Sequence, residues 1–533
     1  MAAPLHIDGT GLTVSDVAQV ARLGRGVSLD PSARTRMRAS RTWVEEVARG
    51  ERAGPDGGPL AVYGVNTGFG SLARVRIPLA RIAELSRNLV RSHAAGVGPA
   101  APRDVARAMV LLRANALARG VSGCRPGLVD LLCALLEHGI DPVVPAQGSC
   151  GSSGDLAPLA HLALLVSHDD ADPDGETGEA WLDDRRVPGR EALASAGLTP
   201  LRLGPKEGLA LTNGAQLTTA FAALAVHDAC ELVLLAEVAA AMSIEALRGV
   251  RRAFHPAVHA QRPYPGARAC AANLLALMTG SSLADSLPDK VQDAYSLRCT
   301  PPVLGAVRDA LTHARTQIEV ELNAATDNPL IVLEVEGDDK ALSAGLFHGE
   351  PVGLAADYLK LAVAELASLA ERRLYRLLTA NLSADLPASM RGDRPGLGLM
   401  ALQTTAAALV SENKALGWPA SMDSIPTCED QEDHVAMSTT AARRAAEVVA
   451  NSQAVVAIEL LCAARALRHR REVDPHVALG AGAAAAFAVL DVLPQCDVPA
   501  EAVQGVQGTI DDGSLMRAVR AACPSLVGVG GRL

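Results

Sequence analysis

Three long stretches rich in Ala, Leu and Val occupy much of the second half of this 533-residue chain. They are residues 215–248, 353–382 and 437–471. In the last stretch Val448, Val455 and Cys462 recur at a seven-residue spacing, so they share one face if the stretch is helical. Because Ala and Leu lose little conformational freedom in a helix, the pattern predicts long helices packed side by side, and hence a mainly α fold.

Aromatic residues are scarce, and together with the charge balance their scarcity excludes several protein classes. The chain has 5 Phe, 3 Trp and 5 Tyr residues, 2% of its length. Ala and Leu fill the missing volume, which favours helices over an all-β sandwich, and few rings are left to stack on nucleic-acid bases. With 49 basic and 59 acidic residues, the formal net charge of −10 provides no basic field for nucleic acid or anionic lipid.

Three features bear on the cellular compartment. The N-terminal residues show no basic region followed by an apolar run, so they do not indicate a signal peptide. The longest stretch without a charged residue, 208–227, contains Thr212, Asn213 and Gln216 and does not predict a membrane span. Ten Cys residues are scattered without a C-x-x-C pair. We therefore expect free thiols, a cytoplasmic protein and no zinc site built from cysteine.

Turn-forming residues divide the first half into shorter elements. Apolar periodicity predicts a helix over 104–120, and Pro126 and Gly139 bound a second helix. Between 169 and 198 the composition becomes acidic and turn-forming, which predicts a surface hairpin. The two expected parts of the chain are residues 1–212, with mixed structure, and residues 213–533, with the long-helix bundle.

The segment 148–158, GSCGSSGDLAP, stands apart because small residues precede an acid and a proline. It fits a flexible turn in which Asp155 caps the following helix. A serine-hydrolase elbow would need glycine at Asp155, and a phosphate cradle would need a Lys that is missing. The third interpretation is internal cyclisation. In it the amide nitrogen of Gly154 attacks the carbonyl of Ser152, and loss of water turns Ser153 into a methylidene group.

Two motifs place scarce Tyr residues in polar surroundings. Tyr63 opens the glycine-rich sequence YGVNTGFG, where the glycines serve tight turns or make Tyr63 a positionable proton acceptor. Tyr295 and Arg298 are three residues apart and would share one face of a helical turn. Arg298 either clamps a substrate carboxylate or pairs with an acid on another helix.

Further polar residues have structural as well as functional interpretations. Asn213 stands where it would cap the first long helix, and Glu432 stands where it would complement the dipole of the last one. His93 and His434 fit ordinary packed or exposed histidines. No His-Glu-x-x-His motif occurs, and the histidines near acids show no ligand spacing, so we expect no metal.

Taken together and in this order, nine motifs resemble the aromatic amino acid ammonia-lyase family, most closely its histidine-specific members. The motifs are YGVNTGFG, SHAAGVG, GSSGDLAPLAH, KEGLALTNG, VQDAYSLRC, TDNPL, FHGEP, SENKALGWPASMDS and QEDHV. The resemblance covers roughly residues 63–471, and the combination is far more specific than a single glycine-rich match. It implies a long-helix bundle of the ammonia-lyase and fumarase/aspartase type, with a smaller mixed N-terminal part, and it favours cyclisation of the Gly/Ser segment.

Members of the family use methylidene-imidazolone (MIO), an electrophile made from three residues of the chain. The resemblance implies that MIO forms here from Ser152, Ser153 and Gly154, with no metal and no external cofactor. In the implied mechanism the substrate amine adds to the methylidene carbon of residue 153 and Tyr63 removes the β-proton. Ammonia then leaves, and an α,β-unsaturated acid remains.

The resemblance also implies roles for side chains around this electrophile. Arg298 would hold the substrate carboxylate, and Asn213 would bond that carboxylate or the MIO carbonyl. Tyr295 and Gln292 would line the site, and Phe347 would pack beside the ring. Helix N-termini pointing at MIO would stabilise negative charge that develops on it.

Three residues point to histidine as the substrate. Ser92 and His93 stand where relatives acting on phenylalanine or tyrosine carry an aromatic residue or His followed by Leu. Glu432 would accept a hydrogen bond from an imidazole N–H, whereas a phenyl ring would leave it buried and unpaired at a cost of about 1–3 kcal/mol. The expected reaction is deamination of L-histidine to trans-urocanate, as in histidine degradation.

Three departures from the family pattern leave alternatives open. Ser152 stands where Ala is usual, Leu346 where Asn is usual, and Pro302 where Gln is expected. A tyrosine or phenylalanine ammonia-lyase, or a 2,3-aminomutase of a biosynthetic pathway, would share the motifs. A non-catalytic helical assembly protein that keeps the scaffold is the alternative from a different class. The resemblance implies a homotetramer whose active sites are assembled from more than one subunit.

Overall fold

The computed structural model describes residues 3–55, 57–68, 74–170, 172, 176–391, 396, 398–494 and 498–531. The chain divides into two compact units, each made of three segments. Unit 1 comprises Met1–His227, Arg315–Asp357 and Pro419–Arg443, and unit 2 comprises Asp228–Ala314, Tyr358–Trp418 and Arg444–Leu533. The chain thus passes several times from one unit to the other, and the predicted division after residue 212 stays a prediction.

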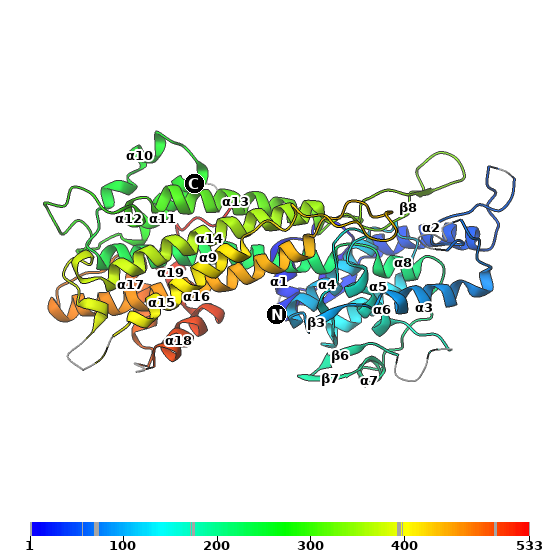
Figure 1. Cartoon of the computed structure of the whole chain (residues 1–533), viewed down its shortest axis with the longest axis horizontal. Helices are drawn as coiled ribbons and strands as arrows, with labels where there is room; N and C mark the ends of the chain where they lie inside the picture. Colours follow the sequence, from blue (N-terminus) through cyan, green and yellow to red (C-terminus); the bar gives the residue numbers. More distant parts are fainter. Residues whose placement is uncertain are drawn as a thin grey trace. The chain divides into compact units, whose positions relative to one another are not determined.

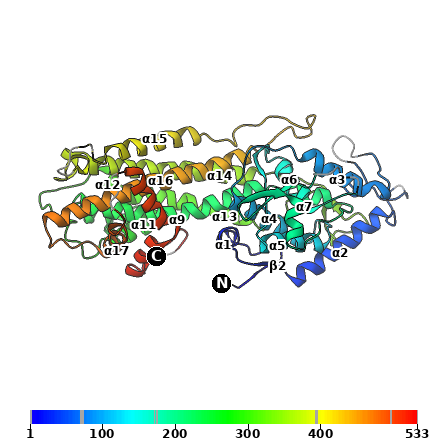
Figure 2. The ribbon, with the colours of Figure 1, turned by 90° about the horizontal axis from the view of Figure 1, so that it is seen from below.

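Four long helices have residues in both units. They are α9 (Gln216–Ala246), α13 (Thr300–Glu321), α14 (Glu350–Leu378) and α16 (Ser438–Val473). The long helices predicted over 215–248, 353–382 and 437–471 are therefore confirmed, with ends shifted by a few residues. In unit 2 these helices run side by side, as Figures 1 and 2 both show. Val448, Val455 and Cys462, which the seven-residue spacing placed on one face of α16, are all 0% exposed.

Shorter helices complete unit 2. They are η3 (Arg251–Phe254), α10 (Pro256–Ala260), α11 (Pro265–Leu277), α12 (Tyr295–Arg298), η4 (Ala380–Leu382), η5 (Ala388–Met390), α15 (Met400–Leu416), α17 (Ala481–Asp491), α18 (Pro499–Asp511) and α19 (Ser514–Ala522). Several begin with Pro in the first turn, where its missing N–H costs nothing. The predicted mainly α fold is confirmed.

Unit 1 mixes helices with short strands. Its helices are α1 (Val14–Leu23), α2 (Pro31–Ala48), η2 (Leu79–Arg81), α3 (Ile82–His93), α4 (Arg103–Ala118), α5 (Pro126–Glu137), α6 (Leu156–Val166), α7 (Gly189–Ser195) and α8 (Glu207–Thr212). Helices α4 and α5 match the two predicted from periodicity and proline placement. Gly120 and Gly139 follow them with φ of 84° and 65°, backbone values that favour glycine and end a helix.

The strands of unit 1 form four small sheets. Strands β1 (Leu5–Ile7) and β2 (Val27–Leu29) pair in parallel. The other pairings are antiparallel: β3 (Val97–Ala100) with β5 (Pro145–Gln147), and β8 (Leu330–Ile331) with β9 (Ala341–Leu342). The remaining sheet has three strands, in which β6 (Glu179–Leu182) pairs with both β4 (Asp141–Pro142) and β7 (Arg185–Pro188). The predicted surface hairpin is β6–β7. Asp183 and Asp184 turn it with φ of 49° and 37°.

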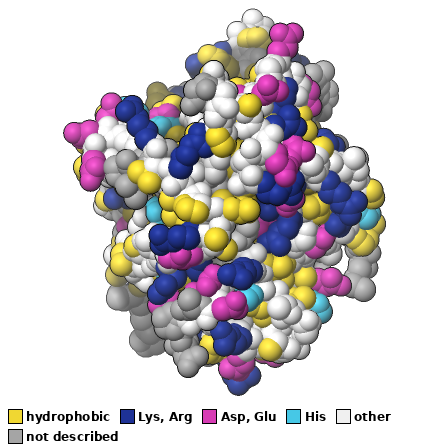
Figure 3. Space-filling model, turned by 90° about the vertical axis from the view of Figure 1, so that its right-hand side faces the viewer, with side chains coloured by type: hydrophobic (Ala, Val, Ile, Leu, Met, Phe, Trp, Pro, Cys, Tyr) yellow, Lys and Arg dark blue, Asp and Glu magenta, His cyan; other side chains and the backbone are white. Residues whose placement is uncertain are grey.

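Surface charge and helix burial can be compared with the expectations drawn from composition. On the face in Figure 3, Lys and Arg side chains are interspersed with Asp and Glu. Among the described residues, α9 and α16 are long and apolar enough to cross a membrane, but 78% and 67% of their apolar windows are buried inside the structure. Such burial is typical of core helices.

Candidate active site

The segment 148–155, here called the serine loop, joins β5 to α6 in unit 1. Gly151 and Gly154 adopt φ of 68° and 78°, which only glycine adopts readily. A Cβ on Gly154 would lie 2.4 Å from backbone atoms of Gly214, and one on Gly151 would lie 1.9 Å from Ser438 Oγ. The small residues of the loop are therefore required by close backbone packing.

Asn213 contacts the serine loop directly. Its Nδ2 donates to the carbonyl oxygen of Ser153 at 2.7 Å, and Asp155 N donates to Gly214 O at 2.7 Å. Asn213 is the residue at which α8 ends, and its side chain does not cap α9, so the capping prediction is wrong. The Oδ1 atom of Asn213 is buried without a hydrogen-bond partner. An acceptor is thus available beside residue 153.

Asp155 binds the start of another helix. Although it precedes α6, its side chain makes no capping hydrogen bond there, which corrects the predicted cap. The fully buried carboxylate instead accepts hydrogen bonds from Thr218 N at 2.7 Å, Thr218 Oγ1 at 2.8 Å, Ser149 Oγ at 2.7 Å and Thr439 Oγ1 at 3.1 Å. Burial raises the pKa of Asp155, while these hydrogen bonds oppose the rise.

The N-termini of four helices meet the serine loop. Helix α6 follows it directly, α9 contributes the N–H of Thr218, and Gly349 N, just before α14, donates to Gly151 O at 2.8 Å. Ser438, the first residue of α16, packs against Gly151. Helix N-termini carry partial positive charge. The expected stabilisation of negative charge at this loop therefore has a structural basis.

Glu432 reaches both serines of the loop. Ser152 Oγ donates to Glu432 Oε2 at 3.1 Å, Ser153 Oγ donates to Oε1, and Thr427 Oγ1 donates to Oε2 at 2.6 Å. Burial alone would raise the pKa of Glu432, but hydrogen bonds from Ser153, Thr427 and Ser152 outweigh it and hold the pKa below its ordinary value. Glu432 precedes α16, which begins at Ser438, so its predicted place in the first turn of that helix is wrong.

Tyr63 and Phe347 lie on loops of unit 1, and both are half-buried. Asn66 holds the Tyr63 turn, because its Oδ1 accepts a hydrogen bond from Val62 N at 2.9 Å. The turn is also held against the residue before α8, since Gly64 O accepts from Lys206 N at 3.1 Å. Phe69 and Gly70 of the YGVNTGFG motif lie outside the described residues. Leu346, which precedes Phe347, is 55% exposed.

Ser92 and His93 end α3. Ser92 Oγ donates to Leu89 O at 3.0 Å, and His93 Nδ1 lies 2.8 Å from the same oxygen. Gly96 packs against Gly148, where a Cβ would lie 3.1 Å from the Gly96 Cα atom. The segment that follows α3 therefore borders the serine loop.

Gln292, Tyr295 and Arg298 belong to unit 2, so unit 1 by itself does not contain them. Tyr295 and Arg298 are the first and last residues of α12, and the Arg298 guanidinium lies 4.7 Å from the centroid of the Tyr295 ring. This confirms that the two side chains share one face. Arg298 Nε donates to Asp293 O at 2.8 Å, and Tyr295 is 71% exposed.

Two residues that contact candidate site residues carried no signal in the sequence. Thr427 holds Glu432 through a side-chain hydrogen bond, five residues away in a loop without periodicity. Arg113, fully buried in α4, donates to Asn213 O at 2.6 Å and to Gln216 Oε1 at 3.0 Å. Arg113 lies inside the helix predicted over 104–120, and apolar periodicity gives no sign of such a contact.

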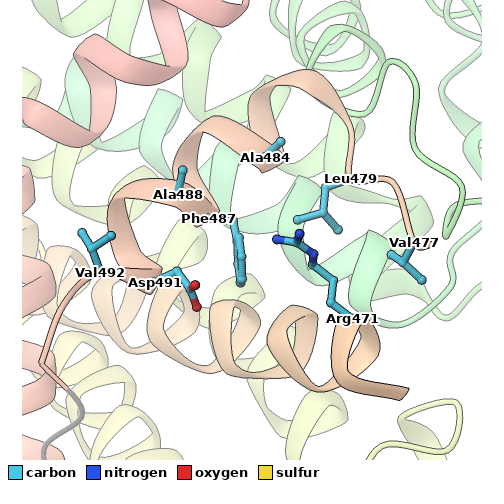
Figure 4. A pocket seen from close by; sticks show the side chains of 8 residues that line it. All are labelled: Arg471, Val477, Leu479, Ala484, Phe487, Ala488, Asp491 and Val492. Carbon is cyan, nitrogen blue, oxygen red and sulfur yellow. The ribbon is translucent and has the colours of Figure 1, made fainter. Parts of the chain in front are cut away.

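A separate pocket lies in unit 2 between the end of α16 and α17 (Figure 4). Its lining includes Arg471, Leu479, Phe487 and Asp491, and none of the predicted site residues. Among the described residues no group of three or more His, Cys, Asp or Glu is arranged to hold a metal ion. The expectation of a metal-free site stays a prediction.

Comparisons with known proteins show which family the chain resembles. The family model described as aromatic amino acid lyase matches residues 12–491. A curated histidine ammonia-lyase from Gloeobacter violaceus is 47% identical over 526 residues, covering 98% of each chain, and one from Geobacillus kaustophilus is 51% identical over 412 residues, covering 77% of this chain and 79% of the relative.

Solved structures of the same fold include two differently named enzymes. Tyrosine aminomutase from Streptomyces globisporus has a TM-score of 0.87 at 35% identity and covers 98% of this chain and 99% of its own. Histidine ammonia-lyase from Trypanosoma cruzi has a TM-score of 0.87 at 35% identity, with coverage of 98% and 96%. The resemblance stated from the nine motifs is confirmed.

Proposed function

Because the chain belongs to the aromatic amino acid lyase family and is therefore a carbon–nitrogen lyase, we propose that it converts L-histidine to trans-urocanate and ammonia. The observation that carries this proposal is Glu432, whose carboxylate lies against Ser152 and Ser153. An imidazole N–H is a matched donor for it, whereas a phenyl ring offers none. The names of curated relatives at 43–51% identity support the same substrate.

The serine loop suits formation of MIO from Ser152, Ser153 and Gly154. Gly154 lies against Gly214 with no room for a side chain, and the carbonyl of Ser153 is held by Asn213. The buried, unpartnered Asn213 Oδ1 is a further polar atom available to the cyclised segment. When formed, MIO supplies an electrophile for the substrate amine. The four helix N-termini at the loop favour negative charge there.

The chain's own side chains take the remaining roles. Tyr63 accepts the β-proton of the substrate through its phenol oxygen. The Arg298 guanidinium, steadied by the Tyr295 ring, binds the substrate carboxylate with two parallel hydrogen bonds. Asn213 orients residue 153, and Glu432 fixes the imidazole. The residues that line or pack the site are Ser92, His93, Gln292 and Phe347.

We also propose that the protein is a cytoplasmic homotetramer, as expected from the family. The exposure of Tyr295 supports shared active sites, because a 71% exposed Tyr beside an arginine is open to a second chain. Measurement of the molecular mass in solution tests the tetramer. Mixing two inactive variants, Tyr63→Phe and Arg298→Met, tests whether the active sites are shared between subunits. Activity regained in the mixture is the expected result, and two inactive variants that stay inactive when mixed would contradict it.

Incubation of the purified protein with L-histidine tests the reaction, because trans-urocanate absorbs in the ultraviolet where histidine does not. The control is Ser153→Ala, which lacks the hydroxyl that leaves as water. No product above this control would overturn the proposal. Intact mass provides the second measurement, since MIO formation removes two waters. A full mass would favour the non-catalytic assembly protein.

Aminomutase activity is the second candidate, and one observation favours it. Tyrosine aminomutase structures match this chain with TM-scores of 0.87–0.88 at 35–36% identity. Product identification after incubation with histidine, tyrosine and phenylalanine separates the outcomes. A β-amino acid would identify a mutase, coumarate or cinnamate would identify a tyrosine or phenylalanine ammonia-lyase, and urocanate supports the first proposal.

A further inference from the structure

The turn that presents Glu432, residues 427–432, is unusually constrained. Thr427 N donates to Glu432 O at 3.0 Å, and Glu432 N donates to Thr427 O at 3.4 Å. Between them Cys428, Glu429 and Asp430 have φ of 52°, 55° and 62°, a left-handed conformation rare for residues with a side chain. Such a turn persists only when its surroundings hold it in place. Its geometry therefore sets where the Glu432 carboxylate points.

The two oxygens of the Glu432 carboxylate have different partners. Oε2 accepts from Thr427 Oγ1 at 2.6 Å and from Ser152 Oγ at 3.1 Å, whereas Oε1 accepts from Ser153 Oγ. Ser152 is 6% exposed, so its hydroxyl is shielded from competing water. Hydrogen bonds to a charged acceptor are the stronger kind, so two donors on Oε2 hold that oxygen in place.

Cyclisation changes these partners unequally. When the Gly154 nitrogen bonds to the Ser152 carbonyl carbon, the carbonyl oxygen leaves as water with the amide protons of Ser153 and Gly154. Ser153 then loses its Oγ as the second water, together with its Cα proton. The hydroxyls of Thr427 and Ser152 take no part in either loss. Oε2 thus keeps both of these hydroxyl donors, and Oε1 loses the hydroxyl of Ser153.

We propose that Thr427 and Ser152 are positioning residues that hold Oε2 of Glu432, so that Oε1, released when Ser153 loses its hydroxyl, accepts the imidazole N–H of the substrate. This inference rests on the proposed function. It gives the departure from Ala at position 152 a role in recognising the imidazole. The Cys428 thiol also donates a hydrogen bond to the Glu432 carboxylate, and the Cys150 thiol interacts with it electrostatically; neither thiol is a cation that would compete with the imidazole.

Ligand binding separates this role from a purely structural one. The variants are Thr427→Val, which keeps the shape and removes the hydroxyl, Thr427→Ser, which restores it, and Ser152→Ala. The probes are trans-urocanate and trans-cinnamate, which share the acrylate group but differ in the N–H. Thr427→Val should weaken urocanate binding about tenfold or more and cinnamate binding less than about twofold. Ser152→Ala, which loses the longer hydrogen bond, should weaken urocanate binding by less.

Two further measurements accompany binding. Intact mass should show loss of two waters in all three variants, because the proposed donors do not take part in cyclisation. The acidic limb of kcat/KM for histidine should move to higher pH in Thr427→Val, because the carboxylate loses a stabilising donor. Thr427→Ser should restore both the limb and the binding.

Ser424→Ala is the matched control, since Ser424 Oγ accepts from Val435 N at 2.9 Å in the same segment. It should leave the ratio of urocanate to cinnamate affinity unchanged. Equal weakening of both ligands by Thr427→Val, unchanged urocanate binding, or retention of the two waters would each overturn the inference. If the variants give such results but the wild type still converts histidine to urocanate, the proposed function stands and only this inference fails. A wild type that forms no urocanate overturns both.

Discussion

The serine loop of unit 1 and the long-helix bundle of unit 2 bury charge by different means. In unit 1 the Asp155 carboxylate accepts hydrogen bonds from a backbone N–H and three hydroxyls, all neutral donors. In unit 2 the buried Glu459 pairs with Arg373 at 2.6 Å and Glu237 pairs with Arg308 at 2.8 Å. Hydroxyls can reorient when nearby atoms change, whereas an ion pair fixes both partners. The loop is thus suited to rearranging covalently, and the bundle to staying fixed.

The largest effect is expected from removing the close packing that the loop requires. Gly154→Ala places a Cβ at 2.4 Å from the Gly214 backbone at φ of 78°. We expect an intact mass that retains both waters and activity no higher than that of Ser153→Ala. The matched control is Gly337→Ala in the same unit, with φ of 85° and no atom within 4 Å of the added Cβ. It should cost only about 1–2 kcal/mol of stability and leave cyclisation intact. Equal masses for both variants would contradict the packing argument.

The bundle should respond to loss of an ion-pair partner by losing stability, with its chemistry unaffected. Arg373→Met leaves Glu459 buried without its cation, at 0% exposure of both side chains, and should cost about 3–5 kcal/mol of unfolding free energy. Replacing Glu459 by Met as well should recover much of that loss. Arg520→Met, which breaks an exposed pair with Glu231 in the same unit, should change stability by less than about 1 kcal/mol. Denaturant melts measure all three, and intact mass should still show both waters lost. A double variant as unstable as Arg373→Met would refute the pairing argument.

How much the sequence predicted also differs between the two regions. Helices α9, α14 and α16 followed from composition and spacing, because a long helix repeats its pattern over many turns. The loop residues were identified through motifs, but their contacts were not. Asn213 and Asp155 both looked like helix caps, since the local pattern of a cap does not show whether the side chain bonds the next helix, a distant helix as Asp155 does, or a loop carbonyl as Asn213 does. Thr427 was missed because its partner depends on a turn of left-handed residues without glycine, which no local pattern predicts.

The pKa values of a buried carboxylate and a half-buried one extend the comparison to pH. Burial raises the pKa of Glu245 in unit 2 to about 7, whereas hydroxyl donors hold that of Glu432 in unit 1 below its ordinary value. As pH rises from about 4.5 to 7, the unfolded chain loses the Glu245 proton that the folded chain keeps, so this group lowers stability by up to about 3 kcal/mol. Glu245→Gln, which keeps an oxygen for Gly480 N, should therefore gain stability over the wild type between pH 5 and pH 7.5. Thermal melts at the two pH values measure the gain, and identical pH dependence in both proteins would refute it.

The smallest effect on stability is expected at Arg298. Although Arg298 is in unit 2, it makes no ion pair of the kind that holds Arg373 or Arg308 among the described residues, and its contacts are the Asp293 carbonyl and the Tyr295 ring. A cation–π contact beside an exposed ring contributes about 0.5–1 kcal/mol, so Arg298→Met should change unfolding free energy by about 1 kcal/mol or less. Its kcat/KM for histidine should nevertheless fall sharply, because the substrate carboxylate loses its two-pronged partner. A melting shift as large as that of Arg373→Met would show that Arg298 supports the bundle, and unchanged kinetics would remove it from the site. A variant that is stable but inactive would show that the Arg298 side chain serves catalysis and that the fold does not depend on it.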